Sequence, residues 1–431
     1  MVKEIFQISL DTEVLYKLRN KVNEEQNISF NKRYGKHRAW DRICAIMDRL
    51  DDTVDYLNGF KLNTGKYNRS AFDFYDFMNN ASVVIDCVKH LAKIFYVSDE
   101  KIKNSTDIFN QVGKDGEGTD ERYFEYLRSL CSVHPVETSR HKRYQDNDFE
   151  CSPFVAWNSG RVRFNDDCDI YAVVYTSKDE ENHKRVRIYI TQIFEYVKTR
   201  LNFVSEITNV INQYQKQVIS DFKNRPIKKE KEFDNYIDYL RNLVKEQTER
   251  YGSDSFYPFD HIINLFEIKL SNPENKDKMD LYLNALKYAI EFEHNSMQNM
   301  SNEGFENNGL LCPERNIETT LYYELCSPHS GSVEQRKYGY NLEKIIYLGY
   351  DLISENDKQW AYIQLEEAST FLEKYVSFED AEGDLEHYAL VELALYLDCL
   401  ENKCLINKNI PNDLTYRQRL LSDNEMRVLF F

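Results

Sequence analysis

Apolar residues recur at every third or fourth position from Ile193 to Phe222, and neither glycine nor proline interrupts them. This spacing keeps one face of an α-helix apolar over about eight turns. Only 14 Gly and 8 Pro occur in the whole chain of 431 residues. A many-stranded β-sandwich needs more turn residues than that. The sequence therefore predicts a mainly α fold made of long helices, and Arg225-Pro226 is expected to end this one.

Other segments show the same helical spacing, and one short region does not. Apolar stripes predict helices over 39–57 and from Ser70, an expected N-cap, to Tyr96. Thr119 is expected to cap a third helix, because Asp120 and Glu121 follow it where the helix dipole favours negative charge. Residues 169–176 and 185–190 are rich in β-branched and aromatic side chains and predict a β-hairpin, part of an apparent insertion at about 154–190.

The C-terminal half also has helical periodicity. A charged connector over 228–232 indicates a domain boundary. We therefore expect one domain over 1–222 and a second, all-helical domain over 223–431, with a regulatory or dimerisation role. Amphipathic segments in the second domain lie near 233–250, 277–297, 341–354, 358–376 and 384–402.

Charge and cysteine content limit the possible functions. The net charge of −17 argues against a general nucleic-acid coat, because phosphate binding needs local positive potential. The nine cysteines include no Cys-x-x-Cys pair, so no metal site and no cofactor is predicted, and reduced thiols are expected. The most apolar helix, 388–400, contains Glu392 and Asp398, and no signal peptide is recognised at the start. We expect a cytoplasmic protein with no membrane partner.

The stretch 125–141 contains two arginines and two histidines around Pro135. Arg128 and His134 are separated by five residues, and Pro135 disfavours helical geometry at His134. An arginine can hold a phosphate through a planar fork of donors, and a histidine can move protons near neutral pH. These two residues are therefore the candidate catalytic pair for RNA cleavage without a metal. The alternative is a surface arginine and a histidine that caps the last helical carbonyls.

A basic cluster follows this pair. Arg140, His141, Lys142 and Arg143 are candidate contacts to an RNA backbone, and a solvated loop is the alternative interpretation. The acids at 166, 167 and 169 lack the ligand spacing of a calcium loop and are interpreted as a solvated turn.

The Arg128-x5-His134 block, together with two long helices before it and a fourth after it, resembles the HEPN superfamily of ribonucleases. The resemblance covers about residues 38–222 and implies a HEPN-like four-helix bundle with the β-hairpin as an insertion. Ser129 stands where that superfamily often has Asn, Asp or His. The resemblance further implies a metal-independent endoribonuclease, usually a homodimer, in phage defence, abortive infection or a toxin–antitoxin system.

From this we expect an RNA substrate, 2′,3′-cyclic phosphate products, and a cognate antitoxin or an activating phage factor as a further partner. Two other functions stay open at this point. One is a non-catalytic helical interaction or regulatory protein of a defence system. The other is a metal-dependent enzyme whose site is assembled from scattered acids.

Overall fold

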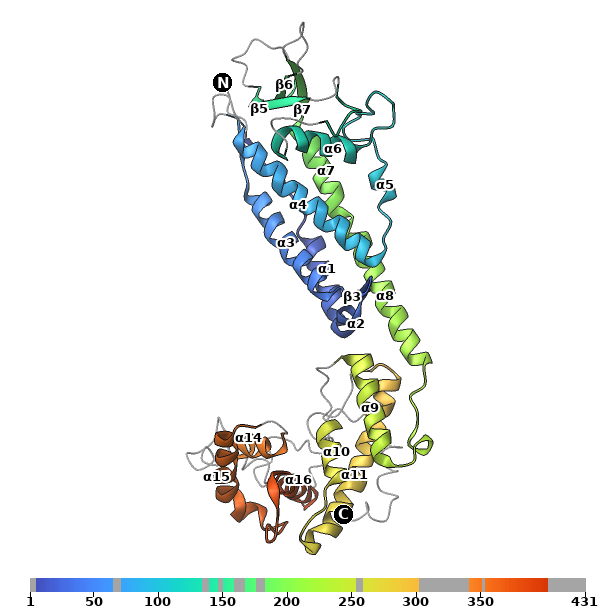
Figure 1. The fold of residues 1–431 in the computed structure, drawn as a ribbon, viewed down its shortest axis with the longest axis vertical. Coiled ribbons are helices and arrows are strands. Elements are labelled where there is room, and N and C mark those ends of the chain that lie inside the picture. Colours follow the sequence, from blue (N-terminus) through green and yellow to red (C-terminus); the bar gives the residue numbers. More distant parts are fainter. Residues whose placement is uncertain are drawn as a thin grey trace. The chain divides into compact units, whose positions relative to one another are not determined.

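The computed structural model describes residues 5–64, 71–133, 139–145, 150–158, 167–175, 183–252, 259–301, 341–350 and 353–401, and these are mainly helical. The chain divides into two compact units, Met1–Val218 and Ile219–Phe431. The division lies inside a helix, and the domain boundary at 222/223 stays a prediction. Figure 1 shows the helices and strands of both units.

The N-terminal unit is built around two long helices that pack along each other, as Figure 1 shows. Its helices are α1 (Glu13–Glu24), α2 (Gln26–Asn31), α3 (Trp40–Gly59), α4 (Phe72–Phe95), α5 (Glu100–Lys103), α6 (Asp120–Arg128), the π-helix η1 (Ser129–Val133), α7 (Ile190–Asn202) and α8 (Val204–Asn224). The apolar stripes predicted for 39–57 and 70–96 form the facing sides of α3 and α4. Leu50, Val54, Val84 and Leu91 are completely buried there, and Val197 of α7 joins them.

Two features near the start of this unit differ from the predictions. Ala71, not Ser70, is the N-cap of α4; it has no capping side chain, and its amide instead donates to the carbonyl of Val155 at 3.1 Å. Ser70 itself lies outside the described residues. Helices α1 and α2 were not predicted, although Leu15, Leu18 and Val22 have helical spacing and are buried.

The helix predicted over 193–222 is two helices, because a one-residue turn at Phe203 separates α7 from α8. Phe203 keeps nearly helical dihedral angles, φ −62° and ψ −19°, and its carbonyl accepts from the amides of Glu206 and Ile207. Both Phe203 and the adjacent Val204 are buried.

A three-stranded antiparallel sheet lies between η1 and α7 in the sequence. The predicted hairpin is found as β6 (Ile170–Tyr175) paired with β7 (Lys184–Ile188), and β5 (Cys151–Trp157) adds a third strand that was not predicted. Side chains alternate between the two faces of β6: Ile170 and Ala172 join the main core, while Tyr171 and Val173 belong to a separate small cluster. Two short antiparallel pairs complete the described strands: β1 (Ile5–Phe6) with β4 (Leu62–Asn63), and β2 (Arg33–Tyr34) with β3 (His37–Arg38).

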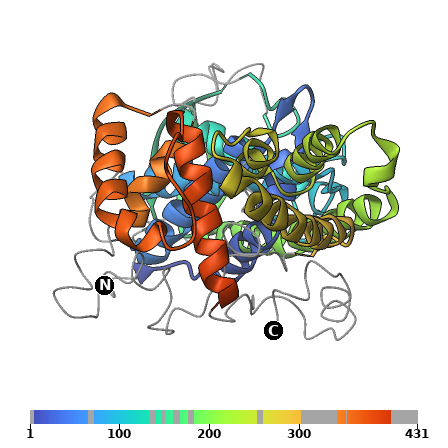
Figure 2. The same cartoon turned by 90° about the horizontal axis from the view of Figure 1, so that it is seen from below.

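The C-terminal unit has a separate core. Its helices are α9 (Tyr236–Tyr251), α10 (Phe259–Glu267), α11 (Pro273–Gln298), α14 (Asn341–Ile345), α15 (Glu355–Leu372) and α16 (Gly383–Glu401), with the 3-10 helices η2 (Glu230–Glu232) and η3 (Ile346–Gly349). The rings of Tyr282 in α11 and Tyr396 in α16 stack with centroids 4.7 Å apart. Figure 2 shows α14 and α15 beside α16. Helix α10 was not predicted, and the segment predicted near 341–354 is shorter than expected.

Candidate functional site

The helix that carries Arg128 is fixed at its first residue. Thr119 caps α6, as predicted, and its hydroxyl accepts from the amide of Arg122 at 3.4 Å. The carboxylate of Asp120 is buried and accepts from the amides of Ile108 and Phe109, at 3.2 and 2.9 Å. Asp120 is thus a structural residue that ties the preceding loop to the start of α6.

A buried ion cluster holds the same end of α6 against α4 and α7. Arg200 is only 1% exposed and donates to the carboxylate of Glu121, while Lys89 approaches the other oxygen of Glu121 at 2.8 Å. Arg200 also donates to the hydroxyl of Tyr196 at 3.2 Å. Burial raises the pKa of Glu121, but hydrogen bonding to Lys89 and the charges of Lys89 and Arg200 together outweigh it, so its pKa lies below the usual value. This cluster was not predicted.

Arg128 is the last α-helical residue of α6, and the chain continues as the π-helix η1. Leu130 and Cys131 of η1 are buried in the main core, whereas Arg128 is partly exposed. Helical structure therefore reaches Val133, the residue directly before His134. His134 itself lies outside the described residues. Because a π-helix closes i→i+5 hydrogen bonds, the angle between residues 128 and 133 differs from that on a straight α-helix.

The basic cluster 140–143 lies against the loop that precedes α6, and its four members have different surroundings. Arg140 and Lys142 are exposed. The ring of His141 lies 5.9 Å from that of Tyr126, two residues before Arg128. Arg143 binds the carboxylate of Asp115 at 2.9 Å and donates to the carbonyl of Glu117. Its charge is therefore partly neutralised, and Arg140 and Lys142 are the stronger candidates for contacting a phosphate.

Aromatic packing joins this segment to α6. The ring of Tyr144 lies 5.2 Å from Tyr123 and 5.3 Å from Tyr126, between centroids. Gly118 permits the close approach, because a Cβ there would come within 2.7 Å of the Tyr144 hydroxyl and 2.6 Å of the Gln111 carbonyl. Tyr126 also donates to the buried carboxylate of Glu150 at 3.1 Å. The structure therefore brings residues 139–145 to the same part of α6 that leads to Arg128.

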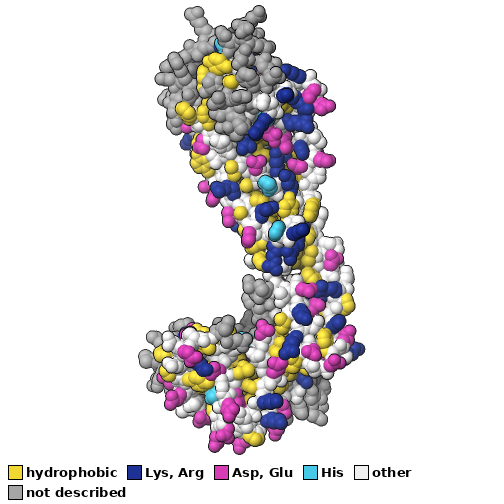
Figure 3. Space-filling view, in the orientation of Figure 1, with side chains coloured by type: hydrophobic (Ala, Val, Ile, Leu, Met, Phe, Trp, Pro, Cys, Tyr) yellow, Lys and Arg dark blue, Asp and Glu magenta, His cyan; other side chains and the backbone are white. Residues whose placement is uncertain are grey.

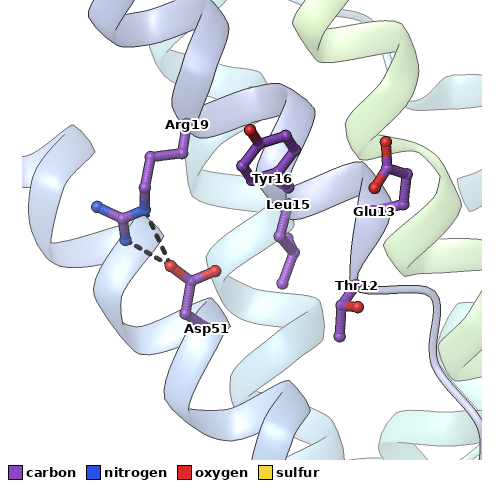
Figure 4. Close-up of a pocket in the computed structure, with 6 residues that line it drawn as sticks. All are labelled: Thr12, Glu13, Leu15, Tyr16, Arg19 and Asp51. Atoms are coloured by element: carbon purple, nitrogen blue, oxygen red, sulfur yellow. Dashed lines mark hydrogen bonds and ion pairs between the residues drawn. The ribbon is translucent and has the colours of Figure 1, made fainter.

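A surface pocket of about 310 Å³ lies elsewhere on the N-terminal unit. Figure 4 shows its lining residues, Thr12, Glu13, Leu15, Tyr16, Arg19 and Asp51. Arg19 donates to Asp51 at 2.6 Å and to Asp48 at 2.9 Å. The pocket's arginine is therefore already neutralised by two carboxylates, and the lining holds no histidine or cysteine for proton transfer or nucleophilic attack.

A group of cationic residues at 32–42, on and around the β2–β3 hairpin, was not identified from the sequence, although its local charge could have indicated it. It contains Lys32, Arg33, Lys36, Arg38 and Arg42, with Asp41 as the one acid.

Within the described residues, no group of three or more His, Cys, Asp or Glu side chains is arranged to hold a metal ion. No described helix is both long enough and apolar enough to cross a membrane. Comparisons of the chain with protein-family models, with curated proteins and with solved structures found no match.

Proposed function

We propose that the protein is an endoribonuclease that cleaves RNA without a metal, with Arg128 and His134 as its catalytic residues. The observation that carries this proposal is the position of Arg128. It is partly exposed where α6 changes into a π-helix, and that π-helix ends directly before His134. π-Helical turns are rare and often occur at functional sites. The basic segment 139–145 packs onto the same helix through Tyr126 and supplies exposed cations beside it.

The proposed chemistry assigns each residue a separate task. The 2′-hydroxyl of a ribose attacks the adjacent phosphorus, the bond to the 5′-oxygen breaks, and the products are a 2′,3′-cyclic phosphate and a 5′-hydroxyl. The attacking 2′-hydroxyl loses its proton and the leaving 5′-oxygen gains one. His134 performs one of these two transfers and water the other, since an unperturbed imidazole titrates near neutral pH. Arg128 stabilises the charge that develops on the non-bridging oxygens, at about 2.7–4 kcal/mol if it acts like one oxyanion-hole donor.

The proposal extends to partners through the HEPN resemblance. A homodimer would bring two copies of the Arg128–His134 pair to a composite site. The C-terminal unit would regulate the nuclease or contribute to dimerisation, and an antitoxin or a phage factor would control its activity. These partners are expectations from the resemblance. The rival proposal is a helical interaction protein with no catalysis, in which Arg128 and His134 have no special role.

Cleavage of total cellular RNA in EDTA tests this function directly. Purified protein is compared with Arg128→Ala and His134→Ala, and the product ends are analysed for cyclic phosphate. Arg122→Ala, an exposed arginine on the same helix, and His90→Ala, an exposed histidine on α4, are the matched controls. We expect discrete cuts that both catalytic substitutions abolish and both controls retain.

The same assay separates the alternatives. A His141→Ala variant asks whether the histidine beside Tyr126, instead of His134, transfers the proton. Cleavage that survives Arg128→Ala and His134→Ala would show that the catalytic pair is wrong. Activity that requires added divalent metal would favour the metal-dependent enzyme, and absence of cleavage with unchanged cellular function in both variants would favour the interaction protein.

A further inference from the structure

The β2–β3 hairpin concentrates positive charge on a strongly acidic chain. Residues 30–42 contain two lysines and three arginines against Asp41, so their net charge is +4, whereas the whole chain has −17. Arg33, Lys36, Arg38 and Arg42 are all exposed. No ion pair joins any of these four side chains to a described carboxylate. Figure 3 shows Lys and Arg side chains gathered at the end of the N-terminal unit where Figure 1 draws β3.

The strand register places like charges together. Arg33 and Arg38 are directly opposed across the two strands, and Tyr34 opposes His37. Like charges at directly opposed positions destabilise a strand pair. Gly35, with a φ of +61°, makes the tight turn that sets this register, because that left-handed conformation suits a residue without a Cβ. Folding alone does not account for two opposed arginines, but an anion bound between them would relieve their repulsion.

Aromatic rings hold the cations of this hairpin in place. The guanidinium of Arg38 lies 4.6 Å from the ring centroid of Phe30, and that of Arg42 lies 5.4 Å from Tyr34. Lys32 is 8% exposed beneath the hairpin, and its Nζ lies 4.4 Å from the ring of Tyr214 and 5.1 Å from that of Tyr96. These contacts replace the carboxylates that usually neutralise such cations, and they leave the positive potential available to an external ligand.

We propose that the surface around the β2–β3 hairpin binds the phosphate backbone of a single-stranded nucleic acid. This surface consists of residues 30–42 together with Tyr96. Planar guanidinium groups recognise phosphates and can stack on bases, and a basic surface with interleaved aromatic rings is the usual form of a single-strand site. Tyr96 is 74% exposed and offers an open ring for stacking. Binding to a membrane surface fits less well, because insertion needs exposed aliphatic or aromatic side chains, and Tyr96 is the only large exposed one in this group.

The hairpin is separate from η1, the π-helix that follows Arg128. Lys32 lies against Phe95 at one end of α4, whereas Cys131 of η1 lies near Tyr75, close to the other end. Phe95 comes twenty positions after Tyr75 on α4, which amounts to about 30 Å along the helix. Binding of a single strand by the hairpin is therefore expected whether or not Arg128 and His134 cleave RNA. If they do, a stacked strand that rises about 3.4 Å per nucleotide would need about nine nucleotides to reach from one surface to the other.

The test measures binding and not cleavage. Full-length protein carrying Arg128→Ala and His134→Ala is titrated, in EDTA, into a fluorescein-labelled single-stranded RNA of about sixteen nucleotides, and anisotropy is recorded over a range of salt concentrations. In this background the hairpin variant has Arg33→Gln and Lys36→Gln. The matched control has Lys228→Gln and Lys231→Gln, two exposed lysines that are also three positions apart. Both pairs change the net charge of the protein equally.

Counterion release gives the expected size of the effect. Each phosphate contact on a single strand contributes about 0.7 to the slope of log affinity against log salt, so removing two contacts should reduce the slope by about 1.4 and weaken binding about tenfold at 0.15 M salt. The control should keep the slope and the affinity of its parent. The melting temperature of the hairpin variant should stay unchanged or rise, because Arg33→Gln removes the repulsion with Arg38.

Four results would overturn the proposal. The first is absence of RNA binding by the parent protein, and the second is equal loss in the hairpin and control variants. The third is tighter binding to phosphatidylserine vesicles than to RNA, lost through the same two hairpin substitutions, which would identify a membrane site. A lowered melting temperature in the hairpin variant would also contradict the argument, because it would make the two residues structural.

Discussion

Replacing Arg200 with methionine removes the centre of the buried ion cluster that holds α6, α4 and α7 together. Methionine preserves much of the side-chain volume but leaves the carboxylate of Glu121 with Lys89, at 2.8 Å, as its charged partner. Asp99, which lies 3.6 Å from Arg200, would lose a cation as well. Both Arg200 and Glu121 are buried, so solvent compensates poorly for the lost contact.

The expected loss of stability can be estimated from these contacts. Removing one partner of a buried ion pair costs about 3–5 kcal/mol, and the remaining contact with Lys89 places this case near the lower end, at about 3 kcal/mol. A unit of this size shifts its melting temperature by about 2–4 °C for each kcal/mol, so a decrease of about 6–12 °C is expected. The Met1–Val218 unit should show this shift.

Tryptophan fluorescence can follow that unit alone. The chain has three tryptophans, and Trp360→Phe leaves Trp40 and Trp157 as reporters, both in the N-terminal unit. In that background, Arg122→Met on the exposed surface of α6 is the control and should change stability by less than about 0.5 kcal/mol. Adding Glu121→Gln to Arg200→Met should recover part of the loss, because the uncompensated charge disappears.

The pH dependence of the same variant is an internal check. Because the folded pKa of Glu121 is below its usual 4.5, its contribution to stability is present above that pH and is lost as the pH falls through the folded pKa. The difference between the parent and Arg200→Met should therefore shrink below about pH 4.5. A loss under about 1 kcal/mol at neutral pH, or a difference that does not depend on pH, would refute the reasoning.

Two further predictions concern buried groups outside that cluster. Burial lowers the pKa of His294, whose Nδ1 lies 3.0 Å from the Tyr239 hydroxyl, so the C-terminal unit should lose stability as the pH falls from 6.5 through the folded pKa. Urea unfolding at several pH values, compared with His294→Gln, measures this, and an identical pH profile in both proteins would contradict it. Burial also raises the pKa of the Cys131 thiol. Iodoacetamide should therefore modify Cys131 only after unfolding, as read by peptide mass, and rapid modification in the native protein would contradict its burial.

Local periodicity predicted the helices whose apolar faces meet in the core. Leu50 and Val54 of α3, and Val84 and Leu91 of α4, have the spacing that places them on one side of each helix, and they are completely buried. The N-cap at Thr119 was also predicted from local sequence. A hydroxyl followed by two acidic residues stabilises the start of a helix whatever the tertiary contacts are.

Other features depend on contacts between distant residues and could not be predicted in this way. Glu121 and Arg200 are 79 residues apart, and nothing in the neighbourhood of either identifies the other as its partner. Arg143 looked like a free phosphate ligand, but the fold brings Asp115 to it. The turn at Phe203 was not predicted, because the helical spacing of apolar residues continues through it.

The candidate catalytic site itself stays a prediction. The Arg-x5-His spacing and the HEPN resemblance named Arg128 and His134, and a run of cations named the basic cluster. Their assignment to RNA cleavage stays a prediction. The hairpin at 32–42 was missed because net charge averages over the whole chain, whereas binding depends on where cations gather and which of them are already neutralised. Composition could not predict that Arg33 and Arg38 oppose each other, because their opposition exists only once the two strands pair.

The π-helix after Arg128 makes the spacing of the motif depend on a single inserted residue. A π-helical turn holds one more residue than the α-helical turn it replaces, so shortening 129–133 by one residue would restore α-helical hydrogen bonding. Val133 would then rotate by about 100° relative to Arg128 and move by about 1.5 Å along the axis. A one-residue deletion in η1 is therefore a way to change the direction in which Arg128 points relative to Val133 while keeping both residues.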